Sequence, residues 1–290
     1  MSTVAFLGVG AMGSRMAMNL HAAGHSLRIF NRDRDKSKPF AAKGAQVCDS
    51  PAAAARGAEF VCSMVSDDVA TREVMLGTSG AVGAAAPGTI ILDSSTNTPE
   101  MAQAVAEAAA AKGVAYLDAP VSGSLPQAQA RELVIMVGGD KPAFDKAQPV
   151  LSAMGSMVRY IGASGAGATL KLINNMLSAS LTVALAEAAQ VAEAANLDRD
   201  VALEVLGAGA TGCRLMKSRL AKMFKRDFAA LFQLSLMEKD LRYFLALAQA
   251  LDRPTPLAAL VRSQYQAARR AQYGRLDSCA VFLQSAGEKP

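Results

Sequence analysis

The sequence predicts an α/β fold in two parts: a doubly wound N-terminal sheet, and an all-α C-terminal domain that opens with one long helix. Over residues 1–163, short apolar strands alternate with helical segments, which is the pattern of a mainly parallel sheet covered by helices. Residues 168–196 contain neither Gly nor Pro, and a segment so rich in Ala and Leu is expected to form a single helix. We therefore expect domains at 1–163 and 164–290, with the long inter-domain helix at about 165–196.

The composition excludes several classes of protein. Hydrophobic residues make up 51% of the 290 residues, so the chain can bury a full core. The formal charge is +5, but Lys and Arg are scattered, which disfavours nucleic acid as a partner and suits a small anionic ligand. The Cys and His residues lack metal-site spacing, so we expect no bound metal. The widely separated Cys residues are expected to be reduced thiols of a cytoplasmic protein. We also expect no signal peptide. The Cys and His residues are His21, His25, Cys48, Cys62, Cys213 and Cys279.

A glycine-rich turn follows the first predicted strand. The apolar run Thr3–Val9 leads into Gly-Val-Gly-Ala-Met-Gly at residues 8–13, and a helical pattern begins at Ser14. Strand, glycines and helix in this order are the signature of a dinucleotide site. The glycines permit the turn, the approach of a pyrophosphate and close helix packing, while N–H groups at the helix start bind phosphate. We predict a Rossmann-type domain that binds its cofactor through Gly8, Gly10, Ala11, Met12 and Gly13.

The end of the second predicted strand, Ser26–Phe30, indicates which cofactor binds. An acidic residue at this position binds the ribose hydroxyls of NAD, whereas an arginine suits the additional phosphate of NADP. Here Asn31 and Arg32 follow the strand, which predicts NADP, with both residues contacting it. Asp33 comes next and could turn towards the ribose instead, so NAD is the alternative.

Further strand ends are expected to line the same site. Predicted strands span residues 59–65, 89–92, 114–117 and 133–137, with helices between them at 67–75 and 99–112. Ligands of doubly wound sheets bind at the carboxyl ends of the strands. The residues at or just beyond those ends are therefore candidates for contact with a nicotinamide or its substrate: Met64, Val65, Ser95, Thr96 and Ser122.

The long helix carries one polar stripe. Lys171, Asn175, Ser178 and Thr182 recur at steps of three and four residues, so they share a face. A lysine in a mostly apolar helix is costly unless its charge has a use, although a lysine near a helix start can also snorkel to solvent. A membrane span is disfavoured, because Lys171 and two glutamates interrupt the segment and no uncharged run reaches about 18 residues.

The rest of the chain is predicted to be helical. Helical patterns cover residues 200–206, 215–224, 232–249 and 256–271, with a last piece near 277–284. No internal repeat or low-complexity linker separates these helices from the sheet. The long helix itself is therefore expected to bridge the domains.

Four segments resemble the β-hydroxyacid dehydrogenase family, which includes 3-hydroxyisobutyrate dehydrogenase, tartronate semialdehyde reductase and glyoxylate/succinic semialdehyde reductase. They are FLGVGAMGSRMAMNL near the N-terminus, DAPVSGS from Asp118, GAGATLKLINN from Gly165 and EKDL from Glu238. Their order and spacing match over essentially the whole chain. The resemblance implies a Rossmann-type domain followed by a helical domain, through which subunits associate as a homodimer or homotetramer.

The resemblance also implies roles for individual residues. Lys171 would be the catalytic group, and Asn175 its neighbour one turn along the helix. Lys239 would reach the cofactor from the helical domain. The residues that would bind substrate, in addition to Lys171 and Asn175, are Thr96, Ser122, Gly123, Ser124, Phe232 and Asp240.

The implied reaction is the NADPH-dependent reduction of a small aldehyde or 2-oxoacid that carries a carboxylate, such as glyoxylate or succinic semialdehyde. Hydride transfer leaves negative charge on the carbonyl oxygen, which the Lys171 ammonium would protonate. Within the family, 3-hydroxyisobutyrate or tartronate semialdehyde activity is the alternative. Imine reductases share the layout but generally lack this lysine, and a non-catalytic NADP-binding scaffold would not need it.

Two positions depart from the family's pattern. Ser124 stands where the commoner form has a second glycine, and the resulting Ser-Gly-Ser is more similar to the glyoxylate/succinic semialdehyde branch, whose NADP preference Asn31 and Arg32 also fit. Arg131 occupies a position before Leu133 where the family usually has glycine. The shape of that hairpin is therefore left open by the sequence.

Overall fold

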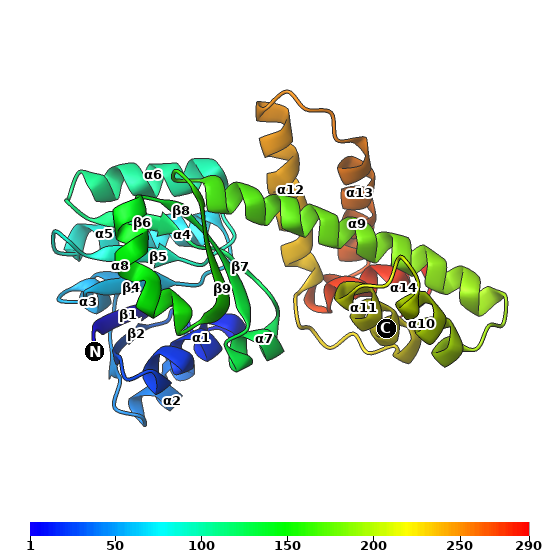
Figure 1. Ribbon diagram of the computed structural model, residues 1–290, viewed down its shortest axis with the longest axis horizontal. Helices are drawn as coiled ribbons and strands as arrows, with labels where there is room; N and C mark the ends of the chain where they lie inside the picture. Colours follow the sequence, from blue (N-terminus) through cyan, green and yellow to red (C-terminus); the bar gives the residue numbers. More distant parts are fainter. Residues whose placement is uncertain (290) are drawn as a thin grey trace. The chain divides into compact units, whose positions relative to one another are not determined.

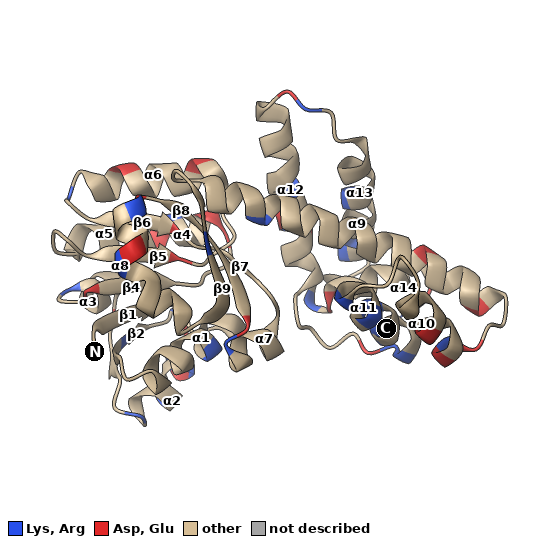
Figure 2. Cartoon of the chain, viewed as in Figure 1, with Lys and Arg blue, Asp and Glu red and all other residues tan. Residues whose placement is uncertain are grey.

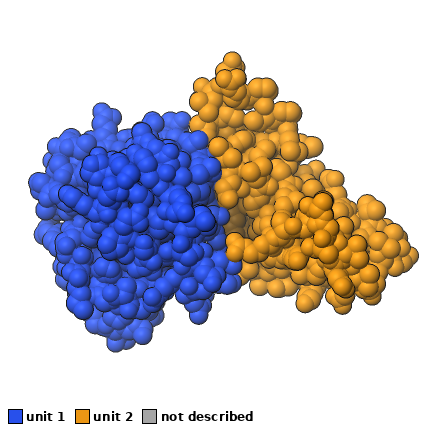
Figure 3. Space-filling view, in the orientation of Figure 1, with its two compact units in different colours: residues 1–171 blue, residues 172–290 orange. Residues whose placement is uncertain are grey.

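The computed structural model describes residues 1–289 (Figure 1). The chain divides into two compact units, Met1–Lys171 and Leu172–Pro290 (Figure 3). The first unit holds the whole sheet and the second is helical, which confirms the predicted fold class. The division falls inside helix α9 (Ala166–Ala194), whereas the sequence placed the domain boundary ahead of this helix, at residues 163 and 164.

The sheet of the first unit has nine strands in the order β3-β2-β1-β4-β5-β6-β8-β7, and β9 pairs with β8. Neighbouring strands from β3 to β6 are parallel, while β8 runs antiparallel to β6 and β7 and parallel to β9. The strands are β1 (Thr3–Leu7), β2 (Ser26–Phe30), β3 (Gln46–Val47), β4 (Phe60–Ser63), β5 (Ile90–Asp93), β6 (Ala115–Asp118), β7 (Val121–Ser122), β8 (Leu133–Gly139) and β9 (Gly155–Gly162).

Helices cover both faces of this sheet, as the central strand β1 shows. Successive strand residues point to opposite faces: Val4 and Phe6 belong to one hydrophobic cluster with Leu20, and Ala5 and Leu7 belong to another. Because both faces are buried, the strand reads as a continuous apolar run. The helical segments of this unit are α1 (Ala11–Ala22), η1 (Arg34–Ser37), α2 (Lys38–Ala41), α3 (Pro51–Ala55), α4 (Asp68–Leu76), α5 (Ala81–Ala84), α6 (Pro99–Ala110), α7 (Leu125–Ala130) and α8 (Lys141–Ser152).

Several elements of this unit were not predicted from the sequence, among them α7, α8 and β9. Helix α8 contains Pro142 and Pro149. Proline is tolerated in the first turn of a helix but removes a hydrogen bond inside it, so the pattern did not suggest a helix. Its buried residues Phe144 and Leu151 pack in the same core cluster as β1, which shows that tertiary packing outweighs the poor propensity.

The second unit is built from helices around its own core. Leu220, Leu241, Tyr265 and Phe282 are each 0% exposed and belong to one cluster. In the view of Figure 2, basic and acidic segments are interspersed along the helices of both units. Besides most of α9, this unit contains α10 (Arg199–Ala208), α11 (Arg214–Lys225), α12 (Leu234–Ala250), α13 (Pro256–Arg270), η2 (Tyr273–Arg275), η3 (Ser278–Ala280) and α14 (Val281–Ala286).

Helix α9 has 29 residues, and at about 1.5 Å per residue it is on the order of 40 Å long. By length and composition alone it could cross a membrane, but the core helix of a soluble protein meets the same criterion. Ala168 and Leu172 are buried near its start, and Ala179 and Ala186 further along. This burial on several turns is what the spread of apolar residues around the helix predicted.

Arg131 ends helix α7 in the left-handed conformation, with φ 62° and ψ 30°. This conformation is natural for glycine and costs other L-residues about 1 kcal/mol. The hairpin therefore keeps the backbone that glycine would favour, although the side chain is arginine.

We expect Arg131→Gly to raise the free energy of unfolding by about 0.5–1 kcal/mol, because it relieves this strain. Urea unfolding measures the change. The matched control is Arg72→Gly, at an exposed position inside α4, which should lower stability by about 1 kcal/mol. A loss of stability in Arg131→Gly would contradict the strain argument.

Candidate active site

The three glycines of the first turn occupy different environments, as their predicted roles require. Gly8 has φ +94°, and a Cβ atom there would lie 2.4 Å from the Met64 carbonyl oxygen. A Cβ atom on Gly13 would lie 2.0 Å from the Gly8 carbonyl oxygen. At Gly10, by contrast, no described atom lies within 4 Å of the Cβ position. The turn is thus tightly packed on the protein side and open at the glycine expected to face a pyrophosphate, which fits a dinucleotide.

The side chain of Asn31 holds this glycine-rich turn. Its Oδ1 accepts a hydrogen bond of 2.9 Å from the Val9 N–H, and its Nδ2 donates to the Asp33 carbonyl oxygen at 2.8 Å. Ala11 and Met12 open helix α1, whose N-cap residue, Gly10, supplies no side-chain acceptor. N–H groups at such a helix start are available to an anion. Asn31 therefore shapes the site through the protein's own backbone.

The two charged residues that decide between NAD and NADP differ in their partners. The Asp33 carboxylate caps η1 by accepting from the Asp35 N–H at 3.2 Å, and it lies 3.7 Å from the Lys36 ammonium. Arg32 is exposed and forms no ion pair with any residue between 1 and 289. The arginine is thus available to a ligand, while the aspartate is used within its own turn.

Asp93 organises the loops at two further strand ends, a role that the sequence analysis missed. This carboxylate, 1% exposed at the end of β5, accepts hydrogen bonds from the Ser63 hydroxyl, the Ser95 N–H, the Asn97 amide and the Tyr116 hydroxyl at 2.7–3.0 Å. The Ser95 hydroxyl in turn accepts from the Val65 N–H at 2.9 Å. The backbones around Met64, Val65 and Thr96 are therefore fixed by a single buried acid.

The predicted substrate loop begins at Ser122, the last residue of β7, which pairs with Val134 of β8. Gly123 has φ +133°, and a Cβ atom there would lie 2.7 Å from Leu133 Cδ2, so only glycine fits. Ser124 directs both its N–H and its hydroxyl to Gln127 Oε1, at 3.0 and 2.8 Å. Ser124 thus caps helix α7, and its contact with substrate stays a prediction.

Lys171 lies in the second turn of α9 and is 9% exposed. The first turn is attached to strand β6 by Asp118, whose carboxylate accepts from the N–H groups of Gly165 and Ala168 at 2.8 and 2.9 Å. Burial raises the pKa of Asp118 from 3.8 to about 6, although these hydrogen bonds favour the charged form. Because the pKa of Asp118 is higher in the folded protein than in the unfolded chain, its contribution to the free energy of unfolding is greatest below about pH 4. That contribution is lost as the pH rises through about 6.

The second unit brings three of the predicted residues together. Asn175 Nδ2 donates to Asp240 Oδ2 at 2.6 Å, and the Lys239 ammonium lies 3.1 Å from Asp240 Oδ1. All three residues are buried. Phe232 precedes α12 by two residues, and its N–H donates a hydrogen bond to Asp277 Oδ2 at 3.1 Å. Asn175 itself follows Lys171 by one helical turn on the same face of α9.

The predicted site residues therefore fall into two groups. The glycine-rich turn, Asn31, Arg32 and the residues after β4 and β5 lie at the carboxyl ends of parallel strands in the first unit, as expected. Ser122 differs from this expectation, because it ends β7, which runs antiparallel to β8. Asn175, Lys239 and Asp240 form a cluster in the second. Across residues 1–289, no group of three or more Cys, His, Asp or Glu side chains is arranged to hold a metal ion. The role of each residue stays a prediction.

Two family models match the chain. Residues 3–162 match the NAD-binding domain of 6-phosphogluconate dehydrogenase, and residues 165–283 match the NAD-binding domain of NADP-dependent 3-hydroxyisobutyrate dehydrogenase. The chain belongs to the β-hydroxyacid dehydrogenase family. It is accordingly an oxidoreductase with an NAD(P)-binding domain, and the resemblance seen in the four sequence segments is confirmed.

Similar proteins in this family act on different small substrates. The chain is 36% identical to the 3-sulfolactaldehyde reductase of Escherichia coli over 98% of its length and 96% of the relative's. It is 33% identical to glyoxylate/succinic semialdehyde reductase 1 of Arabidopsis thaliana over 96% of both chains. The structure of 3-hydroxyisobutyrate dehydrogenase from Salmonella typhimurium superposes with a TM-score of 0.89 at 30% identity, over 97% of this chain and 99% of the other.

Proposed function

We propose that this β-hydroxyacid dehydrogenase reduces a small aldehyde or 2-oxoacid bearing a carboxylate, with NADPH as reductant and Lys171 as proton donor. Glyoxylate and succinic semialdehyde are the first candidates. The observation that carries the proposal is a buried lysine on a helix whose preceding turn is fixed by Asp118 and whose following turn is fixed by the Asn175–Asp240 hydrogen bond. A lysine placed in this way is preorganised for proton transfer.

In the forward direction, NADPH held by the glycine-rich turn and Arg32 would supply the hydride that the carbonyl carbon accepts, and NADP⁺ would remain. The C=O π bond breaks as the C–H bond forms, and its electron pair moves to oxygen. The Lys171 ammonium donates its proton to that oxygen, which gives the hydroxyacid and leaves a neutral amine. The amine then regains a proton from water. In the oxidative direction the neutral amine accepts the hydroxyl proton.

Asn175 orients the groups around this lysine. Its Nδ2 donates to Asp240, and its Oδ1 accepts from the Asn174 amide at 2.9 Å. The side chain can form further bonds, because an amide nitrogen carries two protons and an amide oxygen has two lone pairs. We assign it the role of directing the lysine or the substrate oxygen without changing its own protonation state.

The preference for NADP rests on the different partners of Arg32 and Asp33. An exposed arginine at the end of β2 is suited to the 2′-phosphate. Asp33, which would favour NAD, already accepts a hydrogen bond from the Asp35 N–H. The local geometry therefore supports NADP.

We assign substrate anchoring to Ser122 and Gly123. A hydroxyl and a backbone N–H in a tight turn are good donors to an anion. 3-Hydroxyisobutyrate and tartronate semialdehyde chemistry are the alternatives, and a sulfonate, as in the name of the E. coli relative, is a further anion to test. All of these substrates combine a small reactive carbon centre with an anionic group.

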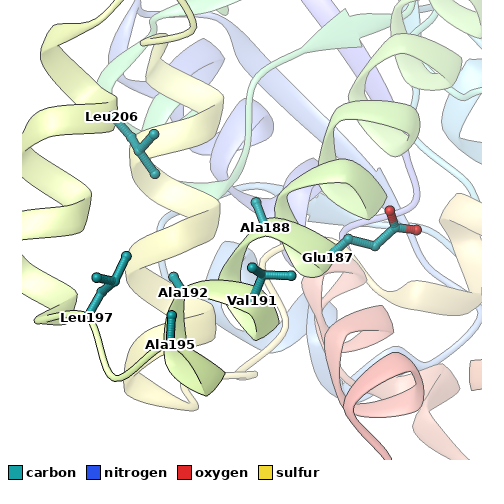
Figure 4. A pocket seen from close by; sticks show the side chains of 7 residues that line it. All are labelled: Glu187, Ala188, Val191, Ala192, Ala195, Leu197 and Leu206. Carbon is teal, nitrogen blue, oxygen red and sulfur yellow. The ribbon is translucent and has the colours of Figure 1, made fainter.

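We propose that the protein assembles as a homodimer or homotetramer through its helical unit. Figure 4 shows an open apolar pocket between α9 and α10, lined by Glu187, Ala188, Val191, Ala192, Ala195, Leu197 and Leu206. Val191 is 69% exposed and Leu197 57%. An apolar surface of this kind is typical of a contact between subunits. Light scattering measures the mass in solution.

Lys171→Ala should lower kcat at least about a hundredfold, the usual contribution of a positioned acid–base group, and leave the affinity for NADPH near normal. Steady-state kinetics and a cofactor titration measure the two effects. Lys146→Ala, at an exposed position in α8, is the matched control and should behave as wild type. Activity within a few-fold of wild type would remove Lys171 from the mechanism.

Arg32→Asp should shift preference from NADPH towards NADH, because a carboxylate repels the 2′-phosphate that the arginine attracts. The ratio of kcat/KM for the two cofactors measures the change. Arg56→Asp makes the same charge change at an exposed position after α3 and should leave the ratio unaltered. The NADP assignment is wrong if the wild-type enzyme already uses NADH better.

Succinic semialdehyde should be a better substrate than butyraldehyde by at least about tenfold in kcat/KM. A substrate without a carboxylate would cover the donors of Ser122 and Gly123 without offering them an anion, at a cost of about 1–3 kcal/mol for each group. Glyoxylate, tartronate semialdehyde and 3-sulfolactaldehyde complete the panel. Equal kcat/KM values for succinic semialdehyde and butyraldehyde would refute the assignment of Ser122 and Gly123 as the carboxylate anchor. Preference for another anionic aldehyde would change only the assignment to the glyoxylate/succinic semialdehyde branch.

A further inference from the structure

Helix α9 begins without any capping side chain of its own. The helix starts at Ala166, so its N-cap residue is Gly165 and its third residue is Ala168. In a capping box, two side chains accept hydrogen bonds from the N–H groups at these two positions. Neither glycine nor alanine can do so. The start of the helix that carries Lys171 therefore depends on acceptors from elsewhere in the fold.

Asp118 supplies both acceptors with one carboxylate. Its Oδ1 accepts from the Gly165 N–H at 2.8 Å, and its Oδ2 accepts from the Ala168 N–H at 2.9 Å. Asp118 ends strand β6 and is 3% exposed. A negative group at a helix N-terminus also interacts favourably with the helix dipole. One side chain thus forms a complete cap across 47 residues of sequence.

Two glycines leave room for this carboxylate. A Cβ atom on Gly138, the strand partner of Asp118 in β8, would lie 2.7 Å from Oδ1 and 2.8 Å from Oδ2. A Cβ atom on Gly167 would lie 2.9 Å from Oδ2 and 2.4 Å from the Met136 carbonyl oxygen. Such distances are too short for any side chain. A side chain at either position would displace the carboxylate from the two N–H groups that it accepts from.

The first turn of α9, which Asp118 caps, lies along the chain between the Ser122 loop and Lys171. Ser122 follows Asp118 after a short connection from β6 into β7, and Lys171 follows Ala168 by three residues, which is nearly one helical turn. We propose that Asp118 is a positioning residue for the reaction: by capping α9 from the end of β6, it sets the place of Lys171 relative to the Ser122 loop. The proposal rests on the proposed function of these two residues.

Only a carboxylate meets the geometry of this cap. An asparagine has one acceptor oxygen, and its NH₂ group would face a backbone N–H, so one hydrogen bond is lost and two donors oppose each other. A glutamate would need room for an additional methylene group in a space already bounded by Gly138 and Gly167. A change at Asp118 should therefore displace the first turn of α9 and reduce the precision with which Lys171 is placed.

The test compares Asp118→Asn with Asp140→Ala in the complete enzyme. Asp140 caps α8 by accepting from the Ala143 N–H at 2.9 Å, so its loss removes a cap from a helix that carries no site residue. Asp118→Asn should lower kcat with the preferred aldehyde at least about tenfold, with KM for NADPH within a few-fold of wild type. Asp140→Ala should reduce thermal stability and leave kcat unchanged.

Three outcomes separate this inference from the proposed function. If Lys171→Ala loses kcat but Asp118→Asn keeps it within twofold, the positioning role is wrong. An equal loss of kcat in Asp140→Ala also overturns it, because a general loss of stability then explains the effect. If wild type reduces none of the anionic aldehydes with NADPH, or Lys171→Ala keeps full activity, the proposed function itself fails.

Hydrogen exchange in the wild-type protein tests the Asp118 cap even if Asp118→Asn does not fold. The first N–H groups of a helix have no partner within the helix, and they exchange quickly unless another group accepts from them. The amides of Gly165 and Ala168 should exchange slowly, unlike that of the exposed Leu257 in α13, a helix that has no side-chain cap. Rapid exchange at both residues would overturn the proposed cap.

Discussion

The geometry of the candidate site depends on the need of buried carboxylates for hydrogen-bond donors. Asp93 and Asp118 end neighbouring strands in register, and both are almost fully buried. A charge in such a place is tolerated only if polar groups surround it. Here the donors come from loop backbones and from the start of α9, including Ser95, Gly165 and Ala168. Satisfying the two acids therefore fixes the segments that carry the predicted site residues.

Long periodic elements could be predicted from the sequence, because burial on one or both faces leaves a direct pattern in the residues. Strand β2 has the predicted bounds, Ser26–Phe30. Elements that depend on distant partners left no such pattern. Helix α8 contains Pro149 but packs in the core, and the edge strand β9 alternates poorly because much of it is exposed. For these, the stabilising contacts come from residues far along the chain.

The same distinction applies to the site. The glycine-rich turn and the stripe that contains Lys171 are local patterns, and both predictions could be made from neighbouring residues. Asp118 follows an apolar strand and precedes Ala-Pro, so from sequence alone it looks like an ordinary turn residue. Its partners lie about 50 residues away, and only the fold brings them together. Asn31 was predicted as a cofactor contact, yet its observed bonds are to the protein's own backbone at Val9 and Asp33.

A cap that fixes where α9 begins also fixes the direction of every side chain along it. Each residue of an α-helix is rotated by about 100° from the one before, so a start displaced by one residue would turn Lys171 away from its present face. The hydrogen bonds from the Gly165 and Ala168 N–H groups to Asp118 oppose that slip. One turn later, the bond from Asn175 to Asp240 fixes the same face again. Lys171 therefore lies between two turns of α9 that are each held by hydrogen bonds. Its long side chain is flexible, but the backbone position from which it extends is well defined.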